Sequence, residues 1–354
     1  MYRPSRIVLL RRFAETLGYA VLGGAMFGWP GLPAGWLSGA ILVTAAAALS
    51  GRPVHVPTVF ARCLFVILGI SLGAAVTPET VSRMATWPVS MVALAIAMSC
   101  STLSVTLYLQ RVHGWDQMSA LFAAAPGALS QALALAASTT ADLRSVAIVQ
   151  TVRVLALAVV LPLVIAGFGM AGEPPPPVAL PSLRDAFLQF GLLLVLSTAA
   201  SLIAYRVRLP GGLIVGAMVT SGILHGGGFV QINLPPVVLI ASFVGLGALI
   251  GSRFLGTDLA RLRALLNAAC GALFVGTSVA ALFAVSVAWL LSLSFADVLI
   301  AYAPGGLEAM MILAFALHLD PAFVGAHHLA RFLYVSVMMP IAVAYVSRRR
   351  QLAE

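Results

Sequence analysis

The sequence predicts an all-α polytopic membrane protein built from two inverted repeats, each with about five transmembrane helices and one segment interrupted by Pro-Gly. Composition, an internal duplication and the distribution of arginine lead to this prediction. Of the 354 residues, 61% are hydrophobic and 9% are charged, and the mean hydropathy is +1.05. Soluble domains carry about 25% charged residues. This chain therefore cannot build a solvated surface, and lipid must be its solvent.

The duplication is visible as matching motifs at a nearly constant offset. "LPAGWLSGAI" at 32–41 corresponds to "LPGGLIVGAM" at 209–218, an offset of 177. Ala-Pro-Gly at 125–127 recurs at 303–305, an offset of 178, and between 124–162 and 302–340 the residues are identical at 12 of 39 positions. Pairs at this second offset are Asp142 with Asp320, Arg153 with Arg331, and Pro162 with Pro340.

A run of four prolines separates the two copies. The stretch "EPPPPVALPSL" cannot form a helix and predicts a stiff, extended linker. We therefore divide the chain into a first membrane repeat at 1–172, a Pro-rich linker at 173–183 and a second membrane repeat at 184–354.

Hydropathy indicates six apolar segments in each half. Most are long enough to cross the hydrocarbon core, which needs about 20 helical residues. The fifth segment of each half is the exception, because Pro-Gly interrupts it near its centre. The segments lie at 10–29, 34–50, 58–77, 87–110, 116–140 and 143–169 in the first half, and at 186–206, 210–226, 235–252, 265–293, 296–318 and 321–346 in the second.

Arginine counting favours one topology. All 20 basic residues are arginine. If all twelve segments span, 11 arginines face the cytoplasm and 7 face out. If each Pro-Gly segment dips in and returns, 16 are inside, Arg83 and Arg184 are outside, and Arg153 and Arg331 lie within the membrane. The positive-inside rule prefers the second arrangement, in which five crossings per half invert the repeats and place both termini in the cytoplasm.

A Pro-kinked spanning helix is the competing interpretation of the interrupted segments. The ten residues before Pro126 and the twelve from Gly127 onward each reach about 15–18 Å as helix, half of the hydrocarbon thickness. Interrupted elements that meet near the midplane between inverted repeats are typical of secondary transporters.

The candidate site residues follow from this geometry. The helix that begins after each Pro-Gly directs its free N–H groups and positive dipole end toward the midplane, which suits an anion. Arg153 and Arg331 are intramembrane cations whose guanidinium groups match a carboxylate; alternatively, each ties hairpin carbonyls or its neighbouring Asp. The predicted substrate-binding residues are Pro126, Gly127, Ala128, Ser130, Gln131, Gln150, Arg153, Pro304, Gly305, Gly306, Glu308, His328 and Arg331.

A coupling ion has its own set of candidate residues. Glu308, His327 and His328 are the candidates for binding a proton or sodium. A helix-capping role for Glu308 and a buried structural role for the histidines are the simpler alternatives. No His, Asp and Glu set has metal-ligand spacing, so we predict no metal and no cofactor.

Three motifs resemble a known family. "PAGWLSGA", "APGALSQALALAAS…DLRSVAIVQTVRVL…LP" and "APGGLEAM…AHHLARFLYVSVMMP" are similar to the duplicated bacterial AbrB-type membrane proteins, labelled AbrB-like regulators or ammonia monooxygenases. The resemblance covers nearly the whole chain and implies a bacterial inner-membrane protein. More distantly, the layout resembles the cation-proton antiporter and anion-transporter group.

The leading functional hypothesis is a secondary transporter of a small organic anion, first of all a carboxylate, driven by protons or sodium, and not an enzyme. The alternatives are a membrane monooxygenase, which needs clustered metal ligands, and a membrane regulatory protein without transport. The expected partners are the anion and the lipid bilayer; a homodimer is left open. No nucleic-acid partner is expected, because the arginines lie in short loops between apolar segments.

The topology makes a direct prediction for cysteine labelling. In a variant without Cys63, Cys100 and Cys270, we introduce one cysteine at Thr140 or at Ser292 and treat intact cells with a membrane-impermeant maleimide. Re-entrant segments place Ser292 outside and Thr140 inside, so only Ser292→Cys is labelled. The reverse pattern is expected if all twelve segments span.

Overall fold

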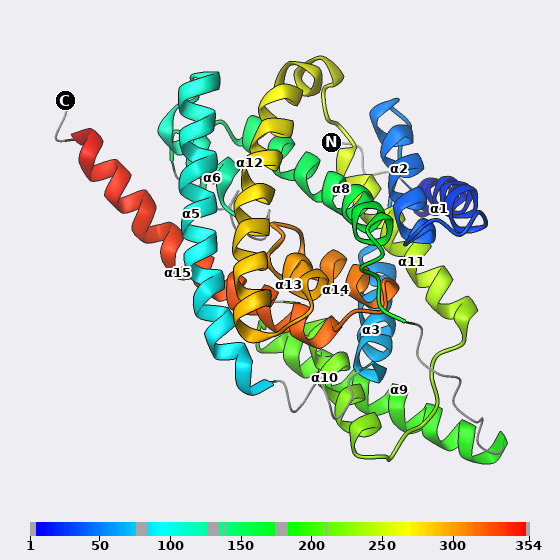
Figure 1. The fold of residues 1–354 in the computed structure, drawn as a ribbon. Helices are drawn as coiled ribbons and strands as arrows, with labels where there is room; N and C mark the ends of the chain where they lie inside the picture. Colours follow the sequence, from blue (N-terminus) through cyan, green and yellow to red (C-terminus); the bar gives the residue numbers. More distant parts are fainter. Residues whose placement is uncertain are drawn as a thin grey trace. The chain divides into compact units, whose positions relative to one another are not determined.

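A computed structural model describes residues 5–75, 84–126, 135–136, 139–173, 183–209 and 211–351. Within these ranges every regular element is a helix, so the predicted all-α class is confirmed. Figure 1 shows the course of the chain. The first half contains α1 (Arg6–Gly28), α2 (Gly35–Leu49), α3 (Thr58–Ala74), the short 3-10 helix η1 (Met84–Thr86), α5 (Trp87–His113), α6 (Gln117–Ala124) and α8 (Leu143–Gly167).

The helices of the second half begin after the proline-rich stretch. They are α9 (Leu183–Arg206), α10 (Gly212–Gly226), α11 (Pro236–Gly251) followed by the 3-10 helix η2 (Ser252–Phe254), α12 (Leu259–Leu291), α13 (Phe295–Tyr302), α14 (Leu307–Ala316) and α15 (Pro321–Gln351). These bounds lie within a few residues of the predicted apolar segments, except α12 and α15, which run farther into polar sequence.

Six of the described helices are long and apolar enough to cross a membrane. They include α5, α8, α12 and α15, whereas α2, α3 and α10 are shorter apolar helices of 15 to 17 residues. Large apolar side chains such as Phe274, Leu282 and Trp289 on α12 are exposed, which suits lipid and not water. The chain is therefore a polytopic membrane protein; the inverted relation of its halves stays a prediction.

The chain forms two compact units that each draw on both halves. The first unit comprises 1–82, 158–257 and 311–322, and contains α1 to α3 together with α9 to α11. The second comprises 83–157, 258–310 and 323–354, and contains α5, α6, α12 and α13 with most of α15. Each unit thus takes the corresponding elements of the two predicted repeats.

Close glycine contacts build the first unit. A Cβ atom added at Gly39 of α2 would overlap the carbonyl of Gly23 on α1, and one added at Gly216 of α10 would lie 2.8 Å from the carbonyl oxygen of Ala200 on α9. Gly23 and Ala200 are separated by 177 residues, as are Gly39 and Gly216. Small residues at this spacing let helix backbones approach in a membrane. The same helix pair is therefore built twice.

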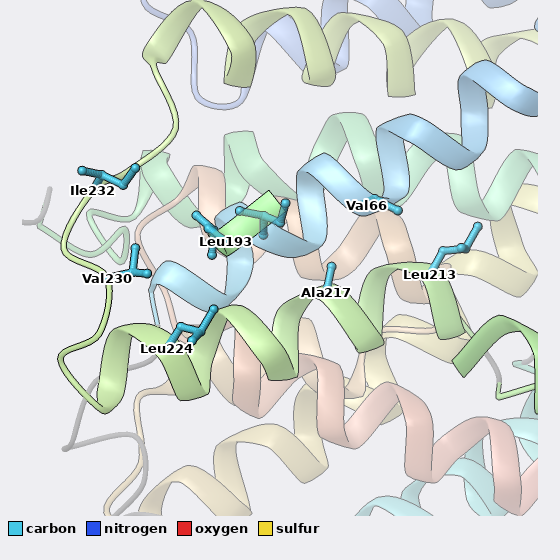
Figure 2. Packing of buried hydrophobic residues seen from close by; sticks show 8 residues of the cluster. Val66, Leu193, Leu213, Ala217, Leu224, Val230 and Ile232 are labelled. Atoms are coloured by element: carbon cyan, nitrogen blue, oxygen red, sulfur yellow. The ribbon is translucent and has the colours of Figure 1, made fainter. Parts of the chain in front are cut away.

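A hydrophobic cluster lies between α3, α9 and α10. Figure 2 shows Val66 of α3, Leu193 of α9 and Leu213 of α10 with their neighbours, and Val230 and Ile232 from the segment that leads to α11. Leu193 and Val230 are each 1% exposed. This cluster fixes α3 against the second-half helices α9 and α10.

In the second unit, α5 and α12 lie side by side (Figure 1). The Ser101 hydroxyl of α5 donates to the Gly276 carbonyl of α12 at 3.4 Å. This packing supports the short helices α6 and α13, which contact α5 and α12 respectively.

The glycine contacts predict an ordered series of stabilities. Gly39→Ala must push α2 away from α1 and should destabilise the protein by roughly 1–3 kcal/mol. Gly18→Ala on the same α1 meets no atom within 4 Å and should leave stability unchanged or raise it slightly. Thermal unfolding of the purified protein in detergent measures both. Equal melting temperatures for the two variants would show that the close approach is unimportant.

Candidate functional site

The backbone breaks at the same place in both interrupted segments. The helix α6 ends at Ala124 and α13 ends at Tyr302, and the next residues, Ala125 and Ala303, have φ −56° with ψ 121° and 134°. A residue before proline is driven out of the helical region by the proline ring. Pro126 and Pro304 therefore stop the two helices in equivalent extended conformations.

The described candidate residues lie in the second compact unit. Pro126, Pro304, Gly305 and Gly306 form the breaks, and Glu308 is in the first turn of α14. Gln150 and Arg153 come from α8, and His327, His328 and Arg331 from α15. The predicted residues Gly127, Ala128, Ser130 and Gln131 lie outside the described residues.

Gln150 and Arg153 form a first clamp on the carboxyl end of α6. The Gln150 amide donates to the Phe122 carbonyl at 2.7 Å. The Arg153 guanidinium donates from Nη1 to the carbonyls of Ala123 and Ala124 at 3.3 Å, and from Nη2 to that of Ala125 at 3.1 Å. The last carbonyls of a helix have no partner within it, and in lipid each unsatisfied group costs several kcal/mol. The first clamp satisfies them.

His328 and Arg331 form a second clamp on the carboxyl end of α13. His328 Nε2 lies 3.1 Å from the Ile300 carbonyl. Arg331 donates from Nη1 to the Ala303 carbonyl at 2.5 Å, and from Nη2 to the Gly305 carbonyl and to His328 Nδ1. Because a carbonyl only accepts, His328 Nε2 carries the proton and Nδ1 accepts from Arg331.

The two clamps match at the offset of 178 seen in the sequence. Gln150 binds Phe122 as His328 binds Ile300, and Arg153 binds Ala125 as Arg331 binds Ala303. The sequence left two alternatives to substrate binding for each arginine: a bond to the carbonyls of the interrupted segment, or a bond to the neighbouring Asp. The bonds to carbonyls are the ones observed. A substrate role for the arginines stays a prediction.

The first arginine does not pair with its neighbouring aspartate. Asp142 instead binds Arg261 at the start of α12 and accepts from the Ser145 hydroxyl at 2.7 Å. Burial raises the pKa of the Asp142 carboxyl, but the bonds from Ser145 and the charge of Arg261 outweigh this and hold it below its ordinary value. This ion pair joins the start of α8 to the start of α12.

Both clamp arginines are buried cations. Arg153 is 6% exposed and Arg331 is 3% exposed, and neither forms an ion pair with a carboxylate in the described part of the chain. The Nε of Arg153 has no hydrogen-bond partner there. Each guanidinium faces a helix carboxyl end, whose dipole offsets only about half a unit charge. The site therefore retains positive charge.

The start of α14 adds a second feature that favours an anion. Its first-turn N–H groups follow Gly306, where an added Cβ would meet no described atom within 4 Å. The half-buried Glu308 places one negative charge in that turn. No group of three or more His, Cys, Asp or Glu side chains with metal-binding geometry is found among the described residues.

Sequence reasoning missed two residues that contact this site. The Tyr302 hydroxyl donates to the Ser90 carbonyl of α5 at 2.5 Å, and Ser90 Oγ lies 2.6 Å from His327 Nε2. Tyr302 directly precedes the Ala-Pro-Gly motif, and this position in the sequence is a signal that identifies it as a candidate. Ser90 has no such signal, because its contact with His327 joins residues 237 apart in sequence.

These features define a polytopic membrane protein with two arginine-clamped helix breaks in one compact unit. The family model described as "Transition state regulatory protein AbrB" matches residues 12–347, so the chain belongs to this family.

Two similar proteins cover most of the chain. "Putative regulator AbrB" of Escherichia coli (strain K12) is 24% identical over 320 residues, which are 89% of this chain and 91% of that protein. "Uncharacterized protein YhjN" of Bacillus subtilis (strain 168) is 26% identical over 352 residues, covering 92% and 90%.

The clamp geometry predicts which substitutions the break tolerates. His328→Gln places in the second half the residue that performs the same task in the first, and should keep the bond to the Ile300 carbonyl. His328→Leu leaves that buried carbonyl without a partner and removes one acceptor of Arg331, which keeps its bonds to the Ala303 and Gly305 carbonyls, at a cost of about 1–3 kcal/mol. Thermal unfolding in detergent should rank His328→Gln clearly above His328→Leu. Equal stability of the two variants would contradict the clamp.

Proposed function

We propose that the protein is a secondary transporter of a small organic anion, first of all a carboxylate, in the bacterial inner membrane. The substrate site lies at the midplane, between the interrupted segments of the two repeats. Transport is coupled to a proton or sodium gradient, and both termini are cytoplasmic.

The observation that carries this proposal is the uncompensated charge of Arg153 and Arg331. Both side chains are buried, and among the described residues no carboxylate pairs with either. Buried charges are normally paired, because desolvation is costly. An anionic substrate supplies the missing negative charge.

The sequence predicts two kinds of donor for this substrate, guanidinium groups and backbone N–H groups. Both guanidinium groups already donate to backbone carbonyls, so the arginines act chiefly by charge and by fixing the conformation of the breaks. The first-turn N–H groups of α14 offer the direct contacts, next to Gly306, where an added Cβ would meet no described atom within 4 Å. Glu308, His327 and His328 are the coupling-ion candidates.

A membrane regulator without transport is the second candidate. The name of the E. coli relative, "Putative regulator AbrB", favours this candidate. The two candidates differ in one measurable property, the movement of an anion across a sealed membrane.

Uptake by reconstituted protein separates these candidates. Purified protein in proteoliposomes is tested with radiolabelled acetate, succinate and citrate under an imposed proton or sodium gradient. We expect saturable uptake of at least one of them. Wild-type protein that is folded and correctly inserted but moves none of the three would favour the regulator.

Two kinds of variant test the site itself. Gly306→Leu adds a side chain where a Cβ would meet no described atom within 4 Å, and we expect uptake to fall at least tenfold at an unchanged melting temperature. Arg153→Gln combined with Arg331→Gln should abolish uptake, whereas Arg253→Gln, an exposed arginine outside the site, should not. Unchanged uptake in either site variant would overturn the proposed position of the substrate.

A further inference from the structure

A buried hydrogen-bond network connects α5, α13 and α15 beside the second break. Tyr302 of α13 donates to the Ser90 carbonyl at 2.5 Å, and Ser90 Oγ lies 2.6 Å from His327 Nε2 on α15. His327 Nδ1 lies 2.8 Å from the Phe323 carbonyl. Ser90 and His327 are 0% exposed and Tyr302 is 3% exposed.

The titratable members of this network have no counterparts in the first half. At the offset of 178, Tyr302 corresponds to Ala124 and His327 corresponds to Val149. The first break is clamped without them, since Gln150 and Arg153 suffice there. Holding a break therefore does not require Tyr302 or His327, and these residues are available for another task.

The hydrogen bonds of His327 can be satisfied with or without an added proton. The Phe323 carbonyl only accepts, so Nδ1 carries a hydrogen in both states. In the neutral ring, the Ser90 hydroxyl donates to Nε2. Ser90 Oγ also lies 3.0 Å from the Trp87 carbonyl. In the protonated ring, Nε2–H donates to Oγ and the hydroxyl turns to Trp87. One hydroxyl rotation thus accommodates the proton.

Its neighbour His328 lacks this freedom. Nε2–H donates to the Ile300 carbonyl and Nδ1 accepts from Arg331. A second ring hydrogen would point at a guanidinium and break the second clamp. The geometry therefore selects His327 over His328 as a proton acceptor.

The charges around His327 set the direction of coupling. Arg331 lies one turn further along α15 and on the same face, and His328 adjoins it. From α13 the facing titratable group is Tyr302, and the contacting residues of α5, Trp87 and Ser90, do not titrate. A proton on His327 is thus opposed by the charge of Arg331. An anion that neutralises this charge favours the proton, and by linkage the proton favours the anion.

We propose that His327 Nε2 binds the coupling proton and that anion and proton move together, as in symport. This inference rests on the proposed function for its physiological meaning. The proton site itself is testable on its own.

The first test follows the histidine rings directly. Full-length protein with [15N]histidine in lipid nanodiscs is titrated from about pH 8 to about pH 4 by NMR. The His327 signal of the wild-type protein is identified as the one that is absent from the spectrum of His327→Gln. This signal should change from the neutral Nδ1–H form to imidazolium, while His328 stays in its Nε2–H form. Adding the anion that gives the highest uptake, or succinate if none is transported, should move the His327 transition to higher pH. A His327 ring that stays neutral throughout, or a transition that does not move, overturns the proposal.

A matched pair of serine variants tests the switching hydroxyl. Ser90→Ala removes the acceptor for Nε2–H and should move the His327 transition to lower pH. Ser99→Ala removes another hydroxyl contact between α5 and α15, the one to Tyr334 at 2.6 Å, and should leave the transition in place. Identical transitions in the two variants would refute the role of Ser90. Neither variant removes a titratable group. The melting temperature of each variant is measured first to verify that it is folded, and the His327 transitions are then compared.

Uptake separates failure of this inference from failure of the proposed function. With acidic medium outside, wild-type proteoliposomes should accumulate the anion above equilibrium, and His327→Gln should lose this accumulation. Accumulation that persists in His327→Gln, or that requires the opposite gradient, overturns the symport proposal but leaves transport standing. Absence of all wild-type uptake overturns the proposed function, while the NMR titration still decides whether His327 binds a proton.

Discussion

The bond between a buried arginine and the carbonyls of an interrupted helix is the interaction on which the second compact unit depends. Proline stops α6 and α13 in the interior of an apolar bundle, where water cannot satisfy the exposed backbone groups. Arg153 and Arg331 satisfy them and at the same time bring two charges to the breaks. A lysine would supply one point charge, whereas the guanidinium fork reaches successive carbonyls. Stability and candidate function therefore arise from the same two side chains.

This double role explains why the two halves are similar in one respect and different in another. The two breaks are bound by donors at matching positions of the offset, a polar side chain and an arginine in each half. The titratable residues beside the second break, Glu308, His327 and His328, have counterparts in the first copy that do not titrate, namely Ser130, Val149 and Gln150. In the proposed symport, a single proton site beside one of the two clamps corresponds to one coupled proton. The difference between the copies thus carries more functional information than their similarity.

Much of this organisation follows from sequence because its causes are local. Apolar length fixes the helix bounds, and proline fixes the ends of α6 and α13 to within one residue. The repeat offset pairs Arg153 with Arg331 from the sequence alone. The sequence did not decide whether the arginines donate to backbone carbonyls or to a carboxylate. The positive charge of an arginine is compatible with both acceptors. Ser90 and the pairing of Asp142 with Arg261 were not predictable, because helix packing brings these residues together across 237 and 119 positions.

The same difference in sequence separation bears on the order in which the protein assembles. Each clamp joins residues only 26 to 30 positions apart, so a break and its clamp can form as soon as one hairpin of chain has been synthesised. Short loops close at low entropic cost. The bond between Ser90 and His327 must wait until the last helix has been inserted. The contact between Ser90 and His327 is thus completed only in a fully inserted chain, and a partly made protein would have clamped breaks without the proposed proton site.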